Sequence, residues 1–227
     1  MKEYKYQMHC HTTPCSRCGR ITPDELAEKL YKAGYSGCVL TNHFYNGNTG
    51  ISRELTWNSF IKAYESDYVK CKKAAEGYNL DILFGIEEHI GNGKEIICYG
   101  ITPEMLYGHS ELKHNEIELW HNTLSSYGVV IIQAHPFRSR SNTPEPGVLP
   151  MNYIDGIEEY NFGNSTDENR LAEEYLKIHT SLIPLSGADA HLSHGLMHGG
   201  IVTSRRVDSS ELLIDILRSR EFSLIKE

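Results

Sequence analysis

Residues 7–12 read Gln-Met-His-Cys-His-Thr and lie at the end of a segment, from about residue 5 to residue 10, that predicts a strand. Side chains alternate between the two faces of a strand, so His9 and His11 project in the same direction. Two imidazoles on one face can bind a single metal ion, but histidine pairs also occur in ordinary half-buried strands. The meaning of the pair therefore depends on what lies at the ends of the other strands.

Outward from this strand, predicted strands alternate with predicted helices. Strand patterns occupy residues 37–41, 81–86, 95–99, 129–134, 156–160, 182–186, 201–203 and 222–225, and helix patterns occupy residues 22–33, 56–76, 111–127, 167–179 and 209–218. Asn92-Gly93 predicts a hairpin turn between two of the strands. The alternation predicts an α/β fold, either a parallel barrel or a doubly wound sheet, in a single domain over residues 1–227.

Composition narrows the possible partners. The formal net charge is -8 over 227 residues, so an extended phosphate backbone would be repelled unless basic residues or metal ions gather locally. A small phosphorylated molecule is therefore favoured over a long nucleic acid. No apolar run approaches the length of a bilayer crossing, and the six cysteines are scattered, which predicts a cytoplasmic protein with reduced thiols and no membrane partner. Composition predicts no oligomeric state.

Side chains that bind metals gather at the carboxyl ends of the predicted strands. They are His9, His11, His43, Glu87, His135, Asp189 and His191. In barrels and open α/β sheets this edge is where the loops converge and chemistry takes place. Seven donors are too many for one tetrahedral zinc, and imidazoles mixed with carboxylates suit two or three divalent ions such as zinc, iron or manganese. Such clusters activate water in phosphoryl transfer, so the pattern predicts a multi-metal hydrolase.

Five motifs occur in a fixed order: His-Cys-His-Thr (9–12), Thr-Asn-His (41–43), Gly-Ile-Glu (85–87), Ala-His-Pro (134–136) and Gly-Ala-Asp-Ala-His (187–191). Together they resemble the polymerase and histidinol phosphatase (PHP) superfamily. The resemblance implies a distorted, seven-stranded (β/α)7 TIM-like barrel and a metal-dependent phosphoesterase, which is a hydrolase. The expected substrate is a small phosphate monoester, with histidinol phosphate as one family precedent, attacked by a hydroxide that bridges two ions.

The resemblance also implies which residues hold each ion. The first ion is expected at His9, His11, Glu87 and Asp189, the second at Glu87 and His135, and the third at His43 and His191. Glu87, Asp189 and His191 are the expected catalytic residues, and either Asp189 or His191 could protonate the leaving oxygen.

Two departures from the family pattern affect the metal ligands. The family often has a histidine in the strand after the glutamate, where residues 96–100 here read Ile-Ile-Cys-Tyr-Gly, so the second ion is expected to lose a ligand. Cys18 stands where the family often has an aspartate for the third ion. A thiolate ligand at Cys18 and a cysteine without a metal role both remain open.

Arginines on the loops beside these motifs are candidates for binding substrate phosphate, because a guanidinium group makes two-point contacts with phosphate oxygens. Arg138, Arg17 and Arg20 are assigned this role, with Arg140 nearby and a solvated loop arginine as the alternative for each. His194, in the glycine-rich loop after the last motif, is predicted to line the pocket.

Three other functions remain open at this stage. The same chemistry would serve a phosphodiesterase or exonuclease acting on nucleotides or short oligonucleotides. The missing family ligands are compatible with a non-catalytic metal-binding module. An amidohydrolase barrel also opens with His-x-His, but Glu87 in place of a bridging lysine and the Gly-Ala-Asp-Ala-His ending favour the phosphoesterases.

Overall fold

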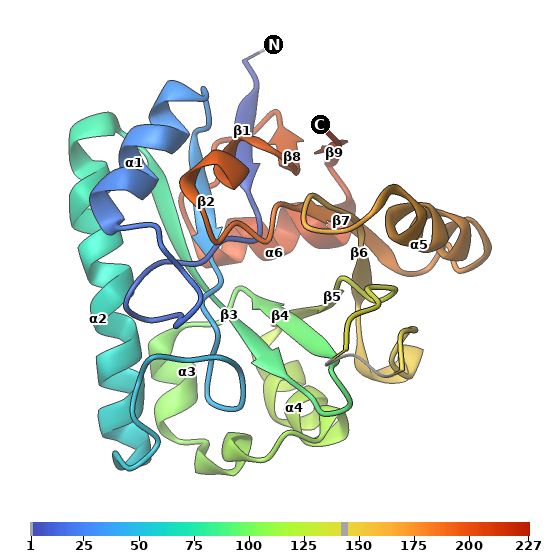
Figure 1. Cartoon of the computed structure of the whole chain (residues 1–227), viewed down its shortest axis with the longest axis horizontal. Helices are drawn as coiled ribbons and strands as arrows, with labels where there is room; N and C mark the ends of the chain where they lie inside the picture. Colours follow the sequence, from blue (N-terminus) through green and yellow to red (C-terminus); the bar gives the residue numbers. More distant parts are fainter. Residues whose placement is uncertain (1, 142–144) are drawn as a thin grey trace.

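The computed structural model describes residues 2–141 and 145–227. Its strands are β1 (Tyr4–Gln7), β2 (Gly37–Leu40), β3 (Asp81–His89), β4 (Glu95–Tyr99), β5 (Val130–Ala134), β6 (Gly156–Asn161), β7 (Ile183–Gly187), β8 (Gly200–Thr203) and β9 (Phe222–Ile225). Its α-helices are α1 (Pro23–Lys32), α2 (Trp57–Ala75), α3 (Pro103–Tyr107), α4 (Ile117–Leu124), α5 (Thr166–Ile178) and α6 (Ser210–Ser219). The strands lie at the centre, with α1 and α2 on one side and α5 on the opposite side (Figure 1).

The strands form one sheet in the order β7-β6-β5-β4-β3-β2-β1-β8-β9. β4 runs antiparallel to both of its neighbours, so β1, β2, β3, β5, β6 and β7 all run the same way around it. β8 and β9 are an antiparallel pair added to the outer edge of β1. The carboxyl ends of the parallel strands and the amino end of β4 therefore share one rim.

Backbone contacts just beyond β1 and β7 bring the two ends of the β1–β7 series together. The amide of His11 donates to the carbonyl of Ala190 (2.9 Å), and the amide of Ala190 donates to the carbonyl of His9 (3.2 Å). The predicted α/β barrel is confirmed as a nearly closed, barrel-like sheet. The predicted count of seven strands is not confirmed, because the described residues contribute nine strands to the sheet and β4 enters it through a hairpin without a helix.

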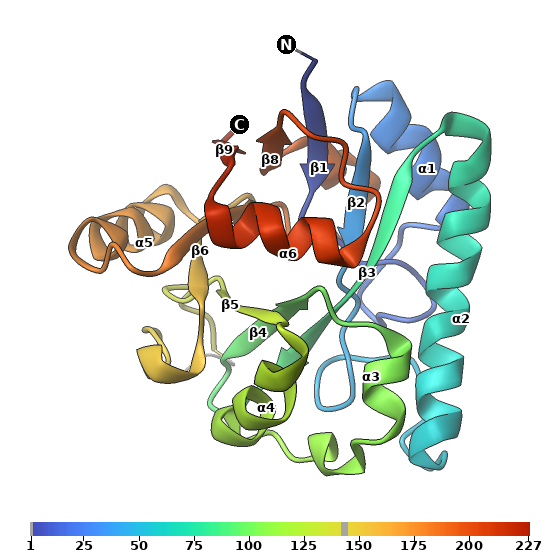
Figure 2. The same cartoon turned by 180° about the vertical axis from the view of Figure 1, so that it is seen from behind.

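The interior of the barrel is apolar and is covered at one end by α6. Tyr6, Met8, Val39 and Ile132 belong to a buried cluster that also contains Leu213, Ile216 and Leu217 of α6. In Figure 2 α6 lies in front of the strands, and Ile214 of α6 packs against Gly100, just after the end of β4. The opposite end, where those strands finish, is left for polar side chains.

Two further cores lie between the sheet and the outer helices. Leu26 and Leu30 of α1 pack with Cys71 of α2 over β2, and Trp57 and Phe60 of α2 belong to a core around Phe44. The helix predicted for residues 56–76 is confirmed as α2, one face of which is buried.

One helix differs from its prediction. The segment expected to be helical over residues 111–127 contains a 3₁₀ turn at Ser110–Lys113, an extended residue at His114, and α4 only from Ile117. The indole of Trp120 donates to the carbonyl of His114 (2.9 Å), which uses that carbonyl outside a helix. Among the described residues, no helix is long and apolar enough to cross a membrane.

Candidate metal centre

Four predicted ligands meet at the rim of the barrel. Nε2 of His9 lies 3.1 Å from Oε1 of Glu87 and 3.2 Å from Nε2 of His11. Oδ1 of Asp189 lies 3.2 Å from Nε2 of His11 and 3.4 Å from Nε2 of His9. Ligand atoms at about 2.0–2.1 Å from a tetrahedral ion are about 3.3–3.4 Å apart, so the spacing of these donors fits one divalent ion.

Two buried polar atoms in this cluster have no hydrogen-bond partner among the described residues. They are Oε2 of Glu87 and Nδ1 of His43, which face each other at 2.8 Å without the geometry of a hydrogen bond. A buried polar atom without a partner is unfavourable unless an ion or water satisfies it. The donor set therefore fits the metal ions that the sequence motifs imply.

The position of His9 is fixed by a carboxylate that sequence reasoning left without a role. Oε1 of Glu158, on β6, lies 2.8 Å from Nδ1 of His9, and Oε2 accepts from the amide of His135 (2.8 Å). A proton on Nδ1 shared with Glu158 leaves Nε2 of His9 free to bind metal. Gly187 makes room for this contact, since a Cβ there would lie 2.5 Å from the Cβ of His9 and 2.7 Å from Oε1 of Glu158.

The position of His11 depends on a buried polar network. Its Nδ1 lies 3.1 Å from Oγ of Ser16, which donates to Oδ1 of Asn42 (2.9 Å). The amide of Asn42 donates in turn to Asp67 on α2 (3.0 Å). Because the Ser16 hydrogen is given to Asn42, the Ser16 oxygen accepts from Nδ1 of His11 and leaves Nε2 for a metal ion.

Two ligand candidates have unusual backbone conformations. His135 has φ +30° and Asp189 has φ +53°; residues with a Cβ seldom adopt positive φ, although Asn, Asp and His do so more often than the others. Conformations of this kind cost about 1–3 kcal/mol each and occur at functional sites. His135 directly follows β5 and Asp189 lies two residues after β7, so both residues stand at the rim.

Glu95, Glu87 and His43 form a second group of donor atoms within 4.8 Å of one another, and His135 lies beside it. Nε2 of His135 lies 3.3 Å from Oε1 of Glu87 and 3.4 Å from Oε2 of Glu95, and Nδ1 of His43 lies 3.7 Å from Oε1 of Glu95. Sequence reasoning missed Glu95. The turn at Asn92-Gly93 was the available indication, because in a hairpin the first residue of the second strand lies beside the end of the first strand.

A third group contains His43, His191 and His11, whose donor atoms lie within 4.8 Å of one another. The rings of His11 and His191 stack at 4.3 Å, and Nδ1 of His191 donates to the carbonyl of Asp189 (2.9 Å). The thiol of Cys18 lies against His191 and His43. Burial opposes ionisation of the thiol, but hydrogen bonds to these two imidazoles lower its pKa to about 6. Its role as a ligand stays a prediction.

The carboxylates control the protonation of the cluster. Burial disfavours the charged form of His9, but the charges of Glu158, Glu87 and Asp189 raise its pKa well above the ordinary value. Burial and the charges of His191 and His43 hold the pKa of His11 well below its ordinary value. Burial and the charge of Glu87 raise the pKa of Glu95 to about 7. This concentration of negative charge is what a bound cation would balance.

A cleft of about 430 Å³ opens above the cluster and is bordered by Glu95, His135, Arg138, Arg140 and His191, among others. Arg138 donates to Oδ2 of Asp189 (2.5 Å) and to Oδ1 of Asn161 (2.8 Å). Arg140 is exposed and pairs with Glu168. The two arginines therefore reach the cleft from the segment that follows β5.

The other predicted substrate contacts lie elsewhere. Arg17 is exposed and its Nε donates to the carbonyl of Thr49 (2.9 Å), and Arg20 is exposed and donates to the carbonyl of Arg17 (3.2 Å). His194 is an exposed residue of a 3₁₀ turn at Ser193–Met197. None of the three borders the cleft in the described part of the chain. Their binding role stays a prediction.

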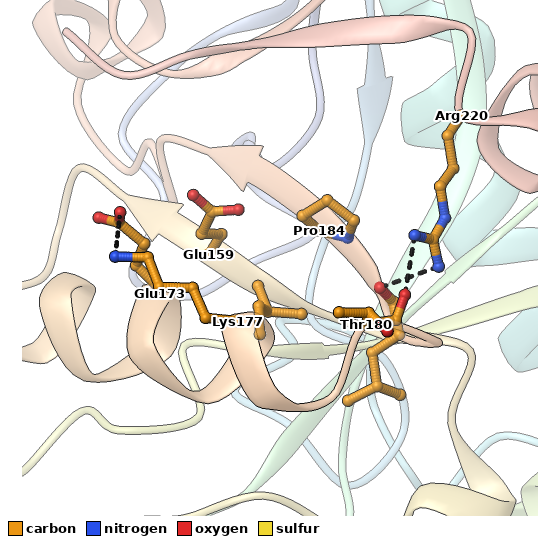
Figure 3. A pocket seen from close by; sticks show the side chains of 8 residues that line it. Glu159, Glu173, Lys177, Thr180, Pro184 and Arg220 are labelled. Carbon is orange, nitrogen blue, oxygen red and sulfur yellow. Dashed lines mark hydrogen bonds and ion pairs between the residues drawn. The ribbon is translucent and has the colours of Figure 1, made fainter.

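A second cavity, of about 280 Å³, lies beside α5 and contains none of the predicted ligands. Figure 3 shows its wall, where Lys177 pairs with Glu173 and Arg220 turns away toward backbone carbonyls. Arg220 donates to the carbonyls of Thr180 (2.9 Å) and Ser181 (2.7 Å). Its guanidinium group is thus used to join the start of β7 to the end of α6.

No family model and no curated protein matches the sequence, whereas solved structures match the fold. A two-domain protein from Bacteroides vulgatus that contains a predicted PHP-like metal-dependent phosphoesterase is similar with a TM-score of 0.69 at 14% identity, over 100% of this chain and 65% of that chain. PsfC from Pseudomonas syringae has a TM-score of 0.69 at 14% identity, over 100% of this chain and 93% of that chain.

The lesion-specific endonuclease PfuEndoQ from Pyrococcus furiosus has a TM-score of 0.64 at 14% identity, over 98% of this chain and 58% of that chain. The chain thus spans less than two thirds of the Bacteroides and Pyrococcus proteins. At this identity the likeness concerns the fold alone, and the proteins that share this fold include one that contains a predicted PHP-like metal-dependent phosphoesterase.

Proposed function

We propose that this protein is a metal-dependent phosphoesterase whose substrate is a small phosphate monoester. The observation that carries the proposal is the set of donors at His9, His11, Glu87 and Asp189, spaced for one ion, with a second group at His135 beside the shared Glu87. The adjoining cleft of about 430 Å³ suits a small molecule. When bound, divalent ions supply Lewis acidity: they activate water and offset the charge of the phosphate oxygens.

The chain's own residues would bind and orient the phosphate group. Arg138 holds Asp189 through one guanidinium nitrogen and Asn161 through another, so its planar group borders the cleft in a fixed orientation. Arg140 stands at the rim and can turn toward a second phosphate oxygen. These contacts are made alike to substrate and transition state, so their loss is expected mainly in KM.

His191 is the residue best placed to protonate the leaving oxygen. Its side chain is 29% exposed and borders the cleft, whereas that of Asp189 is 7% exposed and is held by Arg138. The Nδ1 hydrogen of His191 is given to the carbonyl of Asp189, which fixes the ring, and in the protonated ring Nε2 carries the hydrogen that the leaving oxygen would take. Asp189 and Glu87 would remain ionised and serve as ligands.

The proposal is tested by hydrolysis of para-nitrophenyl phosphate with added Mn²⁺ or Zn²⁺. We expect metal-dependent turnover, and a fall in kcat of about 10²-fold or more for Asp189→Asn. The exposed carboxylate of Asp167 provides the matched control, since Asp167→Asn should keep the wild-type rate. A wild-type protein that binds metal and hydrolyses no phosphate ester would contradict the proposal.

A second candidate is cleavage of phosphodiesters in nucleic acid, which is favoured by the fold shared with a lesion-specific endonuclease. Bis(para-nitrophenyl) phosphate and a labelled oligonucleotide with an abasic site distinguish the two. A monoesterase should prefer the monoester by a large ratio of kcat/KM. Cleavage of the oligonucleotide with little monoester hydrolysis would replace the first proposal by this one.

A further inference from the structure

Glu95 lies among the metal-binding side chains although no sequence motif includes it. It is the first residue of β4, and β4 starts at the rim because it runs antiparallel to its neighbours. In the sheet it pairs with His89 of β3 and with Ala134 of β5. Residues two apart on a strand share a face, so the Glu95 side chain lies on the same side as Glu87 and next to the turn that presents His135.

The carboxylate of Glu95 has no hydrogen-bond donor among residues 2–141 and 145–227. Its side chain is only 20% exposed, and two imidazole nitrogens lie beside its oxygens, Nε2 of His135 at 3.4 Å and Nδ1 of His43 at 3.7 Å. A mostly buried carboxylate without a donor is unfavourable unless a cation is beside it. The neighbouring Glu87, which has an oxygen that also lacks a partner, adds to this requirement.

We propose that Glu95 is a ligand of the second metal ion, together with His135 and the shared Glu87. This inference rests on the proposed function only in taking the cluster to hold metal. The absence of a histidine from residues 96–100 left that ion with two ligands, and Glu95, directly before this run, supplies a third. The adjacent Glu88 does not compete, because its carboxylate accepts from the amides of Asn46 and His89.

The assignment changes the chemical character of the second position. With Glu95, the donors are one imidazole and two carboxylates, and oxygen donors suit Mn²⁺ better than Zn²⁺. The carboxylates of Glu87, Glu95 and Asp189 would together offset most of the charge of two divalent ions. The second position should therefore prefer manganese over zinc more strongly than a position with an additional imidazole.

Metal content tests this assignment without any substrate. The whole chain is stripped with a chelator, dialysed against Mn²⁺ or Zn²⁺, and measured by elemental analysis and by calorimetric titration. Glu95→Ala should lose one equivalent of Mn²⁺, or bind it more than about 10-fold more weakly, while the tighter ion is retained. Glu95→His should regain the equivalent and shift the ratio of bound Mn²⁺ to Zn²⁺ toward zinc.

Glu88→Gln is the matched control, since it alters a buried carboxylate of the same hairpin that points away from the cluster, and it should keep the wild-type content. If Glu95→Ala does not fold, as judged by circular dichroism, Glu95→Gln keeps the shape and gives the same test. Unchanged Mn²⁺ content and affinity in the folded variant would overturn the assignment. A wild type that binds both ions but hydrolyses no ester would contradict the proposed function and leave the assignment of Glu95 in place.

Discussion

Glu158 acts on metal binding through His9. Its Oε1 lies 2.8 Å from Nδ1 of His9, while Oε2 accepts from the amide of His135 and from Asn161 (2.7 Å). One carboxylate thus orients two ligand candidates. Its neighbour Glu159 points to the other face of β6 and pairs with Lys226.

We expect Glu158→Gln to weaken metal binding by about 10–100-fold, because an amide group cannot accept hydrogen bonds at both of its ends. Calorimetric titration with Mn²⁺ measures the change. Glu159→Gln removes the same charge from the opposite face of the strand and should bind metal as the wild type does. Equal affinities for the two variants would show that Glu158 has no positioning role.

Gly187 permits the contact between His9 and Glu158. A methyl group at this position would lie 2.5 Å from the Cβ of His9. Gly187→Ala is therefore expected to destabilise the protein by about 1–3 kcal/mol, as overpacking does, and to reduce metal affinity. Gly77→Ala meets no atom within 4 Å and should change stability by less than about 1 kcal/mol. Urea denaturation compares the two, and equal midpoints would refute the steric argument.

At this scale the sequence predicts ligands better than the residues that support them. His9, His11, Glu87 and Asp189 meet because strand ends converge, which alternation and strand patterns predict. Glu95 and Glu158 escaped assignment for a physical reason: a carboxylate in a strand looks the same in sequence whether it faces the rim or the solvent. The pairing and register of the strands decide whether the carboxylate faces the rim or the solvent.

At the scale of the elements, the N-terminal cap of α5 also contacts the segment that borders the cleft. Glu168 completes the capping box with Ser165, and its other oxygen accepts from the amide of Ser139 and from Arg140, both at 2.8 Å. The start of α5 thus holds the segment that follows His135. Burial opposes ionisation of Glu168, but these hydrogen bonds lower its pKa from 4.5 to about 2.

A carboxyl group whose pKa is lowered in the folded state stabilises the fold above its unfolded pKa and loses this effect as the pH falls toward its folded pKa. Glu168→Gln should therefore be less stable than the wild type by about 1–2 kcal/mol at pH 7. The difference should shrink between about pH 4.5 and pH 2. Urea denaturation of both proteins across this range measures it, and a difference independent of pH would show that the charge of Glu168 contributes nothing.

Most elements follow from local pattern, and the exceptions have local causes. Helix patterns over residues 22–33 and 56–76 predicted α1 and α2. A helix was predicted over residues 111–127, yet the Trp120 indole takes the carbonyl of His114 and α4 starts only at Ile117. A hydrogen bond from a side chain to the backbone six residues earlier is not encoded in a pattern of apolar spacing.

At the scale of the whole molecule, the apolar core under α6 and the candidate metal site lie at opposite ends of the barrel. Ile216 of α6 is fully buried at the end opposite the rim, and Ile178 of α5 is 78% exposed. Ile216→Ala is expected to lower the free energy of unfolding by about 2–5 kcal/mol, and Ile178→Ala by less than about 0.5 kcal/mol. Thermal melts measure both. Metal content per folded chain should stay unchanged, and its loss in Ile216→Ala would show that the two ends are coupled.

The alternation of strands and helices predicted an α/β fold, either a barrel or a doubly wound sheet, and the family resemblance implied the barrel. β4 joins the sheet through a hairpin, and β8 and β9 are added outside β1. The family resemblance implied seven strands. How β8 and β9 attach depends on pairing between segments about 200 residues apart, such as Tyr4 with Thr203, which no local pattern encodes.

The backbone bonds between His11 and Ala190 place the seam of the barrel directly beneath the ligands. His9 and His11 belong to one side of this seam and Asp189 to the other. An ion held by all three would be a reversible cross-link between the two ends of a long stretch of chain, comparable in its effect on chain entropy to a disulfide across the same span. Binding of the metal ion should therefore slow hydrogen exchange of the backbone amides at the seam. The ion would stabilise the closed barrel as well as take part in catalysis.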